Sequence, residues 1–122
     1  MTTLTEALAP CAPIVSEAPG FRSRSVATIP AATEIRVGMV LGKVTTGGAY
    51  VPLAPAASDG SQKAAAVALY PLAAAATGPR QITVFDMDGE LRLSDLEWPA
   101  GISANDKATA VAQLLALGIK LR

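Results

Sequence analysis

The chain has 122 residues, a length that fits one domain and leaves no room for a second core of ordinary size. Its ten basic and ten acidic side chains cancel, and no block of positive charge is present to neutralise phosphates, which argues against nucleic-acid binding. Hydrophobic residues make up 51% of the chain, but 25 of them are alanines and aromatic residues reach only 4%. Such a core buries little apolar area per residue, which suggests that partner subunits supply further burial.

Signals for export, membrane insertion and disulfide formation are missing from the sequence. The first residues, MTTLTEALAPCAP, lack a basic region and a continuous apolar stretch, so they do not form a signal peptide. The longest apolar run, residues 64–76, is too short to span a bilayer and contains Pro71. The single cysteine, Cys11, lies between prolines without an obvious electropositive neighbour, so we expect no chemical role for it. These features predict a soluble, intracellular protein at synthesis.

Residues 1–32 differ from the rest of the chain. They are rich in Pro, Ala, Ser and Thr and show no sustained hydrophobic period. Ordering a residue costs roughly 1–2 kcal/mol, which so few large apolar side chains cannot offset by their own contacts. We therefore expect an N-terminal arm over residues 1–32 that is disordered when free, and a folded domain over residues 33–122.

Within this arm, residues 20–29 alternate in character. In an extended chain, successive side chains would lie on opposite sides. One side would carry Arg22, Arg24, Val26 and Thr28, and the other Ser23, Ser25, Ala27 and Ile29. A period of two suits a strand that adds to the edge of another sheet. The alternative is a flexible tail without a function.

The first half of the domain contains β-rich segments. Residues 35–44 are rich in β-branched side chains and predict a strand, and TTGG at 45–48 predicts a turn into a return strand. Pro52 marks that return strand as an edge or a bulge. Residues 63–72 stay ambiguous, because their alanines favour a helix whereas their short length and Val67, Leu69, Tyr70 and Pro71 favour a buried strand.

The second half predicts a hairpin and a helix. Residues 82–93 form two short runs around the turn residues Asp88 and Gly89, which predicts a β-hairpin. Ser103 followed by Asp106 resembles a capping box, and Gly118 suits a left-handed C-cap. The apolar stripe expected between them comprises Ala108, Val111, Ala112 and Leu115, widened by Leu114 and Leu117. A short strand, IKLR, closes the chain. The predicted fold is α+β: a small mostly-β domain with short strands and one C-terminal helix, preceded by an extended N-terminal arm.

No constellation of catalytic or metal-binding residues is found. Histidine is absent, which removes the commonest general base and metal ligand. Asp86 and Asp88 are flanked by predicted strands, so a hairpin turn fits them better than a calcium loop. Asp95 and Glu97 are expected to be solvated surface charges, and TTGG lacks the lysine of a phosphate-binding loop. We expect no enzyme activity, no cofactor and no metal.

From Met39 to Leu121 the order of these features resembles one protein family. A hairpin leads through a loop into an alanine-rich strand, then into GELRLSDLEWPAGISANDKATA, where a strand, an acidic linker, Trp98-Pro99 and a capped helix follow in order. This pattern is similar to that of the head decoration proteins of bacteriophage lambda and its relatives, which cement phage capsids. The arm matches in character only, is longer, and precedes a middle that is richer in alanine.

The resemblance implies a structural protein of the virion. It implies trimers at three-fold sites on the outer surface of the expanded capsid, stabilising it against internal DNA pressure, with host cytoplasm as the location during assembly. The expected partners are the major capsid protein and further copies of the chain, without nucleic acid or membrane. It implies a strand over residues 64–72, and an arm that orders on the major capsid protein by adding a strand. The arm residues expected to contact the capsid are Phe21, Arg22, Ser23, Arg24, Ser25 and Val26.

Trp98 and Pro99 leave two interpretations open. They form either a structural corner over one end of the small core, with Pro99 just past a strand, or a contact with the trimer or the capsid. Function also leaves alternatives, namely a small non-enzymatic adhesion or ligand-binding module displayed on a virion or cell surface, or a non-catalytic domain of an enzyme subunit.

Overall fold

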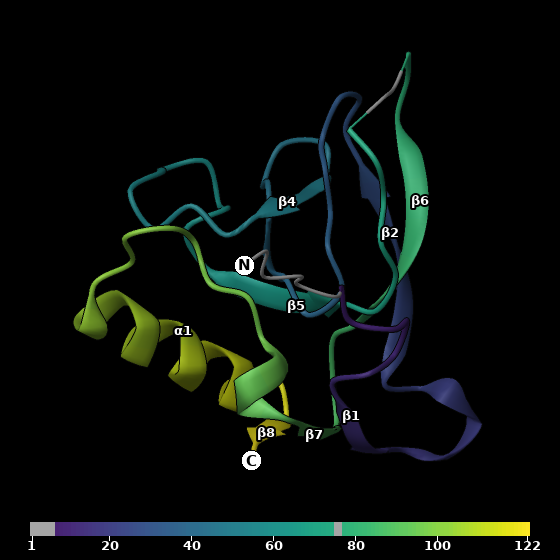
Figure 1. Cartoon of the computed structure of the whole chain (residues 1–122). Helices are drawn as coiled ribbons and strands as arrows, with labels where there is room; N and C mark the ends of the chain where they lie inside the picture. The colour runs from purple at the N-terminus through teal and green to yellow at the C-terminus, as the bar shows by residue number, and fades with distance from the viewer. Residues whose placement is uncertain (1–6, 75–76) are drawn as a thin grey trace, which may run out of the picture.

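A computed structural model describes residues 7–74 and 77–122 of the chain. Within them it contains eight short strands in two sheets, two single turns of 3-10 helix and one α-helix near the C-terminus (Figure 1). This confirms the predicted α+β class, in which a small mostly-β domain carries one C-terminal helix. Residues 1–6 of the predicted arm lie outside the described residues.

The larger sheet has five antiparallel strands. In spatial order they are β2 (Arg24–Ile29), β6 (Arg80–Phe85), β5 (Ala64–Ala68), β3 (Val40–Lys43) and β4 (Tyr50–Pro52). The two edge strands, β2 and β4, nevertheless come within 8 Å of each other between Cα atoms. The sheet therefore curls around its own inner face.

The smaller sheet joins the two ends of the chain. Its strands are β1 (Ile14–Glu17), β7 (Gly89–Leu91) and β8 (Ile119–Leu121), with β7 in the centre. β1 pairs with β7 in antiparallel fashion and β8 pairs with β7 in parallel. Strands from residues 14 and 121 thus share one sheet.

Apolar side chains on the two faces of the larger sheet belong to two separate clusters. The inner face of the curled sheet contributes Ala27, Ile29, Ile35, Met39, Leu41, Ala66, Ala68, Ile82 and Val84. The second cluster lies between the outer face, the smaller sheet and the helix, and comprises Val40, Leu53, Ala64, Val67, Leu69, Phe85, Leu91, Leu96, Ala110, Leu114 and Ile119. Neighbours such as Val40 and Leu41 enter different clusters because strand side chains alternate between faces.

The β3–β4 hairpin and the strand at β5 confirm the sequence predictions. Gly47 and Gly48 adopt φ values of 86° and 74°, which glycine reaches without a steric penalty. Pro52 lies on an edge strand, where the ladder needs no donor from it. The alanines of β5 are mostly buried between the two clusters, so tertiary packing decides the helix-or-strand ambiguity.

The predicted hairpin over residues 82–93 is wrong, although both strands exist. β6 belongs to the larger sheet and β7 to the smaller one, so they do not pair with each other. Asp88, with φ of 46°, turns the chain out of the larger sheet. Its N–H donates to the Leu117 carbonyl (3.2 Å), and the N–H of Gly89 donates to that of Gly118 (3.0 Å). The C-terminal residues therefore take the place of the expected partner.

Helix α1 (Ala104–Ala116) begins and ends as predicted but buries only part of the predicted stripe. The Ser103 hydroxyl accepts a hydrogen bond from the N–H of Asp106 (3.1 Å), and Gly118 has φ of 86°. The buried helix residues are Ala110 and Leu114, four positions apart, whereas Leu115 is 60% exposed. The prediction is right for Leu114, which is buried, and for Val111, which is half-buried, but wrong for Ala108, Ala112, Leu115 and Leu117, which are exposed.

Residues 11–32 are integrated in the domain, which differs from the boundary predicted between residues 32 and 33. The N–H of Cys11 donates to the Leu69 carbonyl (2.8 Å), and β2 pairs along its length with β6. Ala27 and Ile29 are 1% and 0% exposed. The alternation predicted the strand, but these two side chains complete the inner cluster of their own chain. Disorder of the arm in the free protein stays a prediction.

Candidate functional site

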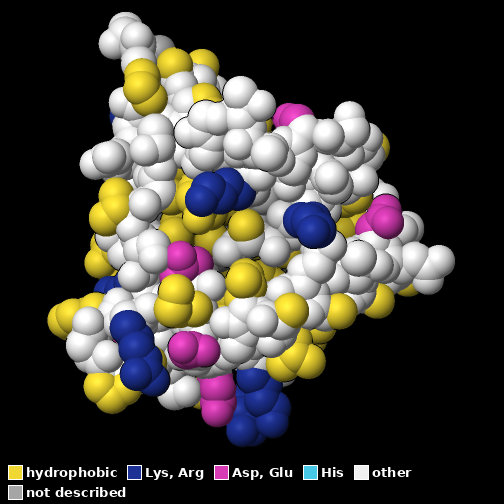
Figure 2. Space-filling view, turned by 180° about the vertical axis from the view of Figure 1, so that it is seen from behind, with side chains coloured by type: hydrophobic (Ala, Val, Ile, Leu, Met, Phe, Trp, Pro, Cys, Tyr) yellow, Lys and Arg dark blue, Asp and Glu magenta, His cyan; other side chains and the backbone are white. Residues whose placement is uncertain are grey.

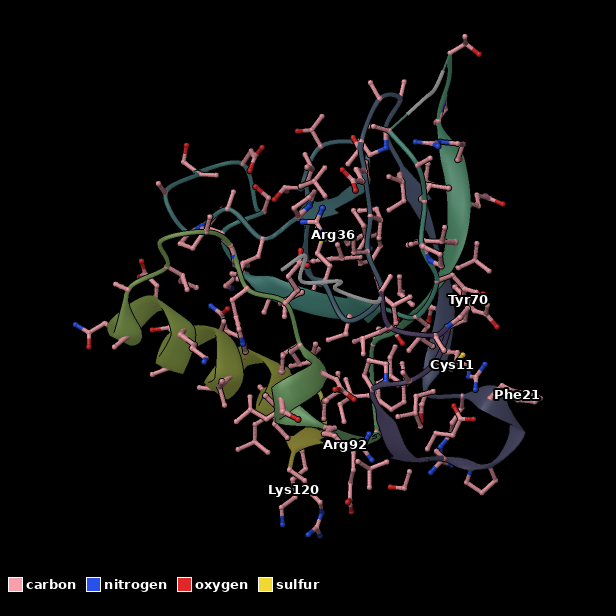
Figure 3. All side chains as sticks on the ribbon, viewed as in Figure 1. Cys11, Phe21, Arg36, Tyr70, Arg92 and Lys120 are labelled. Atoms are coloured by element: carbon pink, nitrogen blue, oxygen red, sulfur yellow. The ribbon has the colours of Figure 1, made fainter. Side chains whose placement is uncertain are left out.

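The six residues predicted to contact a capsid lie in the loop between β1 and β2 and on β2 itself. This β1–β2 loop contains one turn of 3-10 helix, η1 (Pro19–Phe21), and projects from the body on the side away from α1 (Figure 1). Phe21, Arg22 and Val26 are exposed, whereas Arg24 and Ser25 are partly buried. Figure 3 shows Phe21 at the outer margin of the molecule, with its ring pointing away from the core.

Ser23, the remaining member of the set, faces inward and is 0% exposed. Its hydroxyl donates to the backbone carbonyl of Asp88 (2.6 Å) and accepts from the N–H of Ala18 (2.9 Å). The N–H of Asp86 donates to the Ser23 carbonyl (2.9 Å). Ser23 therefore holds the base of the loop against the turn after β6, and its side chain is not part of the exposed surface.

Arg24 connects the loop to β1 through an ion pair. Its Nε and Nη2 atoms donate to the two carboxylate oxygens of Glu17 at 2.8 and 2.9 Å. Such two-point pairing is geometrically specific, and it raises the pKa of Arg24 above its ordinary value. The guanidinium carbon of Arg24 lies 5.3 Å from the centre of the Phe21 ring, within cation–π range.

Cys11 and Tyr70 lie on the same side of the molecule as Phe21 (Figure 3), and both interact electrostatically with Arg24. A hydrogen bond with the Cys11 side chain and the electrostatic interaction with it raise the pKa of the exposed Tyr70 phenol. Arg24 interacts electrostatically with both residues, so the expectation that Cys11 has no electropositive neighbour is wrong. The sequence did not show this proximity, because Cys11 precedes β1 of the smaller sheet whereas Arg24 begins β2 of the larger sheet. The two residues come together only when both sheets have formed.

A shallow hollow extends the apolar surface along β2. It has a volume of about 460 Å³ and is lined by Val26, Tyr70, Pro71, Leu72, Gln81, Ile82 and Thr83. Val26 is 66% exposed and Tyr70 is 38% exposed. Tyr70 and Pro71 were not among the predicted contact residues. The signal that could have identified them is the sequence LYPL, in which an aromatic residue and a proline follow the buried strand β5.

Trp98 and Pro99 lie between an isolated bridge and the start of α1. Glu97 bridges Met39, with the N–H of Glu97 donating to the Gly38 carbonyl at 2.8 Å. The Trp98 ring is half-buried against the second apolar cluster, and the ammonium of Lys107 lies 5.3 Å from its centre. The chain then turns at Pro99, whose carbonyl accepts from the N–H of Ile102 (3.2 Å). This geometry suits a structural corner.

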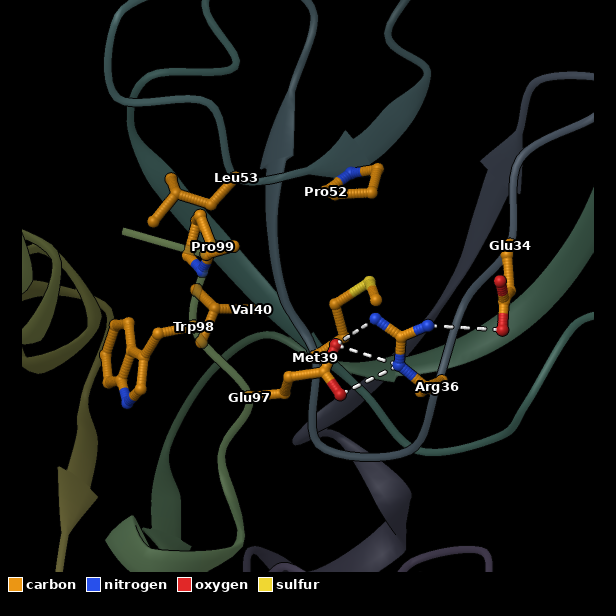
Figure 4. A pocket seen from close by; sticks show the side chains of 10 residues that line it. Glu34, Arg36, Met39, Val40, Pro52, Leu53, Glu97, Trp98 and Pro99 are labelled. Carbon is orange, nitrogen blue, oxygen red and sulfur yellow. Dashed lines mark hydrogen bonds and ion pairs between the residues drawn. The ribbon is translucent and has the colours of Figure 1, made fainter. Parts of the chain in front are cut away.

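A second hollow of about 260 Å³ lies next to this corner (Figure 4). Pro52, Leu53 and Pro99 line its apolar side. Arg36 donates to both oxygens of Glu97 at 2.5–2.9 Å and to Glu34 at 3.1 Å, and these contacts raise the pKa of Arg36. The two carboxylates of the hollow thus share one arginine, which balances one of their two negative charges.

The described residues offer little for bond-making chemistry. Asp95 and Glu97, which were expected to be solvated surface charges, bind different arginines, Arg92 and Arg36 respectively. In the ranges 7–74 and 77–122, no cluster of three or more His, Cys, Asp or Glu side chains could hold a metal ion. Nor does this part of the chain contain a helix long and apolar enough to cross a membrane. What the surface offers is an aromatic loop and an apolar strand face, which suit contact with another protein.

Comparison of the sequence with known protein families identifies the chain as a structural protein of a phage head. A family model described as bacteriophage lambda head decoration protein D matches residues 3–119, nearly the entire chain. The protein therefore belongs to the bacteriophage lambda head decoration protein D family. Membership implies a structural role in decorating the capsid, and with it binding to the capsid and a location on the virion. No curated protein matches the chain.

Proposed function

We propose that the protein binds as a trimer to the outside of the expanded capsid at three-fold sites, and stabilises the shell against the pressure of packaged DNA. The partner is the major capsid protein, and neither nucleic acid nor a membrane takes part. The protein would wait in the host cytoplasm during assembly and end on the outer surface of the virion. The observation that carries this proposal is the family match over residues 3–119.

The distribution of apolar side chains supports association with other chains. Large hydrophobic side chains with 37–67% exposure in the described part of the chain are Leu8, Val15, Phe21, Val26, Tyr70, Met87, Leu93, Leu115 and Leu117. Figure 2 shows such side chains reaching the surface among charges of both signs. Apolar groups that are open to solvent gain free energy when a partner covers them. A three-fold ring would use two different surfaces of each copy, because its contacts are heterologous.

The N-terminal region would supply the contact with the capsid. In this proposal the N-terminal arm becomes ordered on the major capsid protein, as the resemblance implies. The exposed side of residues 21–26 adds a second contact, with Ser23 serving only to hold the loop. The conformational entropy that an arm loses when it becomes ordered lowers its affinity for the capsid. Once one arm of a trimer has bound, the effective concentration of the second and third arms near their sites is about millimolar. The trimer therefore binds more tightly than a single arm does.

Stabilisation of the shell then requires no catalytic group. A bound trimer would bridge neighbouring capsid subunits, so that the shell opens only when several contacts break together. Trp98 and Pro99 would act from inside the protein as the corner that fixes α1 against the sheets. Zero net charge allows many copies to lie close together without strong repulsion.

The test is binding of the purified chain to expanded and unexpanded shells of its phage, measured by cosedimentation. Light scattering is expected to give about three times the chain mass of 12.4 kDa. We expect binding to expanded shells only, and shells that resist heat and denaturant better once decorated. A monomer in solution, or a full-length protein that does not sediment with expanded shells, would contradict the proposal.

A further inference from the structure

We propose that the β1–β2 loop is a preformed docking element whose Phe21 ring enters an apolar pocket on the major capsid protein, with Arg22 pairing with a carboxylate at its rim. This inference rests on the proposed function and deepens it. It assigns part of the capsid contact to a rigid, ordered loop, in addition to an arm that orders on binding. Preformed elements lose less conformational entropy on binding than flexible ones.

The base of the loop is held by buried hydrogen bonds. Ser23 closes the loop onto Ala18 at 2.9 Å and ties it to Asp88 at 2.6 Å. The N–H of Asp86 adds a bond of 2.9 Å to the Ser23 carbonyl. The loop is thus attached at both ends to the turn that connects the two sheets, so its tip is presented in one orientation.

The Arg24–Glu17 ion pair supports the ring from behind. The two side chains are only 22% and 24% exposed, and the guanidinium lies 5.3 Å from the ring centre of Phe21. Because Glu17 is bound at two points, Arg24 is restrained in its position under the ring. A large aromatic side chain on a restrained support is typical of the residues that contribute most to protein–protein affinity.

The backbone at Phe21 carries strain that the free domain does not use for packing. Phe21 has φ of 59°, in the left-handed region that side chains rarely adopt. Its ring is nevertheless 67% exposed, so this conformation directs an apolar group into solvent. Strain maintained at an exposed position points to a role in binding, and burial in a partner would remove the ring from water.

The charges on the loop indicate what surrounds the partner's pocket. Glu17 is neutralised by Arg24, whereas Arg22 is exposed and makes no ion pair within the described part of the chain. The loop therefore presents one unpaired positive charge beside the ring. A carboxylate at the rim of an apolar pocket complements both features, and opposite charges across an interface raise the association rate and the specificity.

The decisive variant is Phe21→Gly, because glycine adopts φ of 59° without strain. The melting temperature is expected to stay equal to wild type or to rise, while affinity for expanded shells falls roughly ten-fold or more, as for a central aromatic contact. Ala112→Ser is the control, since Ala112 is exposed on α1 and is not among the large apolar side chains named above. It should bind within about two-fold of wild type.

The variant Arg22→Glu tests the proposed pairing of Arg22 with a carboxylate at the rim of the partner's pocket. It is expected to weaken binding at low salt and to make the remaining affinity less sensitive to salt. Three results would overturn the inference: Phe21→Gly binding within about two-fold of wild type, a salt dependence unchanged by Arg22→Glu, or loss of the trimer in Phe21→Gly, which would assign the ring to a neighbouring copy. Failure of wild type itself to bind shells would instead overturn the proposed function.

Discussion

The hydroxyl of Ser23 donates a hydrogen bond of 2.6 Å to the backbone carbonyl of Asp88, 65 positions further along the chain. The same oxygen accepts from the N–H of Ala18 at 2.9 Å. One buried side chain thus links the β1–β2 loop to the turn between the two sheets. Polar groups at such positions are costly to leave unsatisfied, because water cannot replace a missing partner.

Replacing Ser23 with alanine is therefore expected to lower the free energy of unfolding by about 1–3 kcal/mol. The N–H of Ala18 would be left without its acceptor. Ser16→Ala, on the exposed side of β1, is the control and should change stability by less than about 0.5 kcal/mol. Denaturant unfolding of both variants measures the difference, and equal stabilities would show that the Ser23 bonds contribute nothing net.

Gly38 and Gly101 separate backbone strain from steric overlap. Both have positive φ, 88° and 72°, but a Cβ atom at Gly38 would lie 2.1 Å from the Asp95 carbonyl oxygen, whereas one at Gly101 meets nothing within 4 Å. We expect Gly101→Ala to cost about 1–2 kcal/mol from the left-handed conformation alone. Gly38→Ala should cost roughly a further 1–3 kcal/mol, because the segment at residues 95–97 must move. Thermal unfolding compares them; similar losses would contradict the close approach.

Deletions of different length test where the folded domain begins. Removal of residues 1–10 leaves the Cys11–Leu69 hydrogen bond and β1 in place, so circular dichroism should show a cooperative transition close to that of wild type. Removal of residues 1–32 takes away β2 together with Ala27 and Ile29, and we expect a chain without a cooperative transition. A stable, cooperatively folding fragment starting at Thr33 would instead support the domain boundary predicted from the sequence.

The Cys11–Tyr70 contact predicts a particular alkaline titration. The interaction with Cys11 raises the pKa of Tyr70. The protonated phenol is therefore favoured in the folded state, and its contribution to stability is present at lower pH and is lost as pH rises through the folded-state pKa. In a Tyr50→Phe background, where Tyr70 is the one remaining tyrosine, tyrosinate absorbance should titrate above the ordinary value of about 10.

Adding Cys11→Ala to that background should move the titration of Tyr70 back toward its ordinary value, since the interaction with Cys11 that contributes most to the raised pKa is removed. The nearby Arg24, which favours the ionised phenol, stays in place. A titration curve that does not change on removal of the thiol would contradict the contact.

Features that depend on neighbouring residues in the sequence were predictable, and features that depend on distant partners were not. The cap at Ser103, the turn at Gly47 and Gly48 and the alternation along β2 follow from local backbone chemistry. The pairing of β7 with β1 and β8 does not, because the turn residues at Asp88 allow either a hairpin or a crossing between sheets.

The candidate site shows the same division. Exposure of Arg22 and Val26 agrees with their shared side in the alternating sequence, whereas Phe21 is in phase with the buried Ser23 and is nevertheless exposed. Burial of Ser23 depends on a carbonyl group 65 positions away, and the approach of Cys11 and Tyr70 to Arg24 depends on both sheets. A sequence pattern gives the side of a strand on which a residue lies, but not which distant backbone group will meet it.

The smaller sheet has a consequence for the order in which the protein matures. β7 is the central strand, and its partners begin at residue 14 and end at residue 121. Contacts between residues so far apart in the sequence form late in folding, because closing the long loop between them costs conformational entropy before the contacts stabilise the chain. Leu91 and Ile119 of the second apolar cluster are therefore fully covered only once strands from both regions of the chain have met at β7.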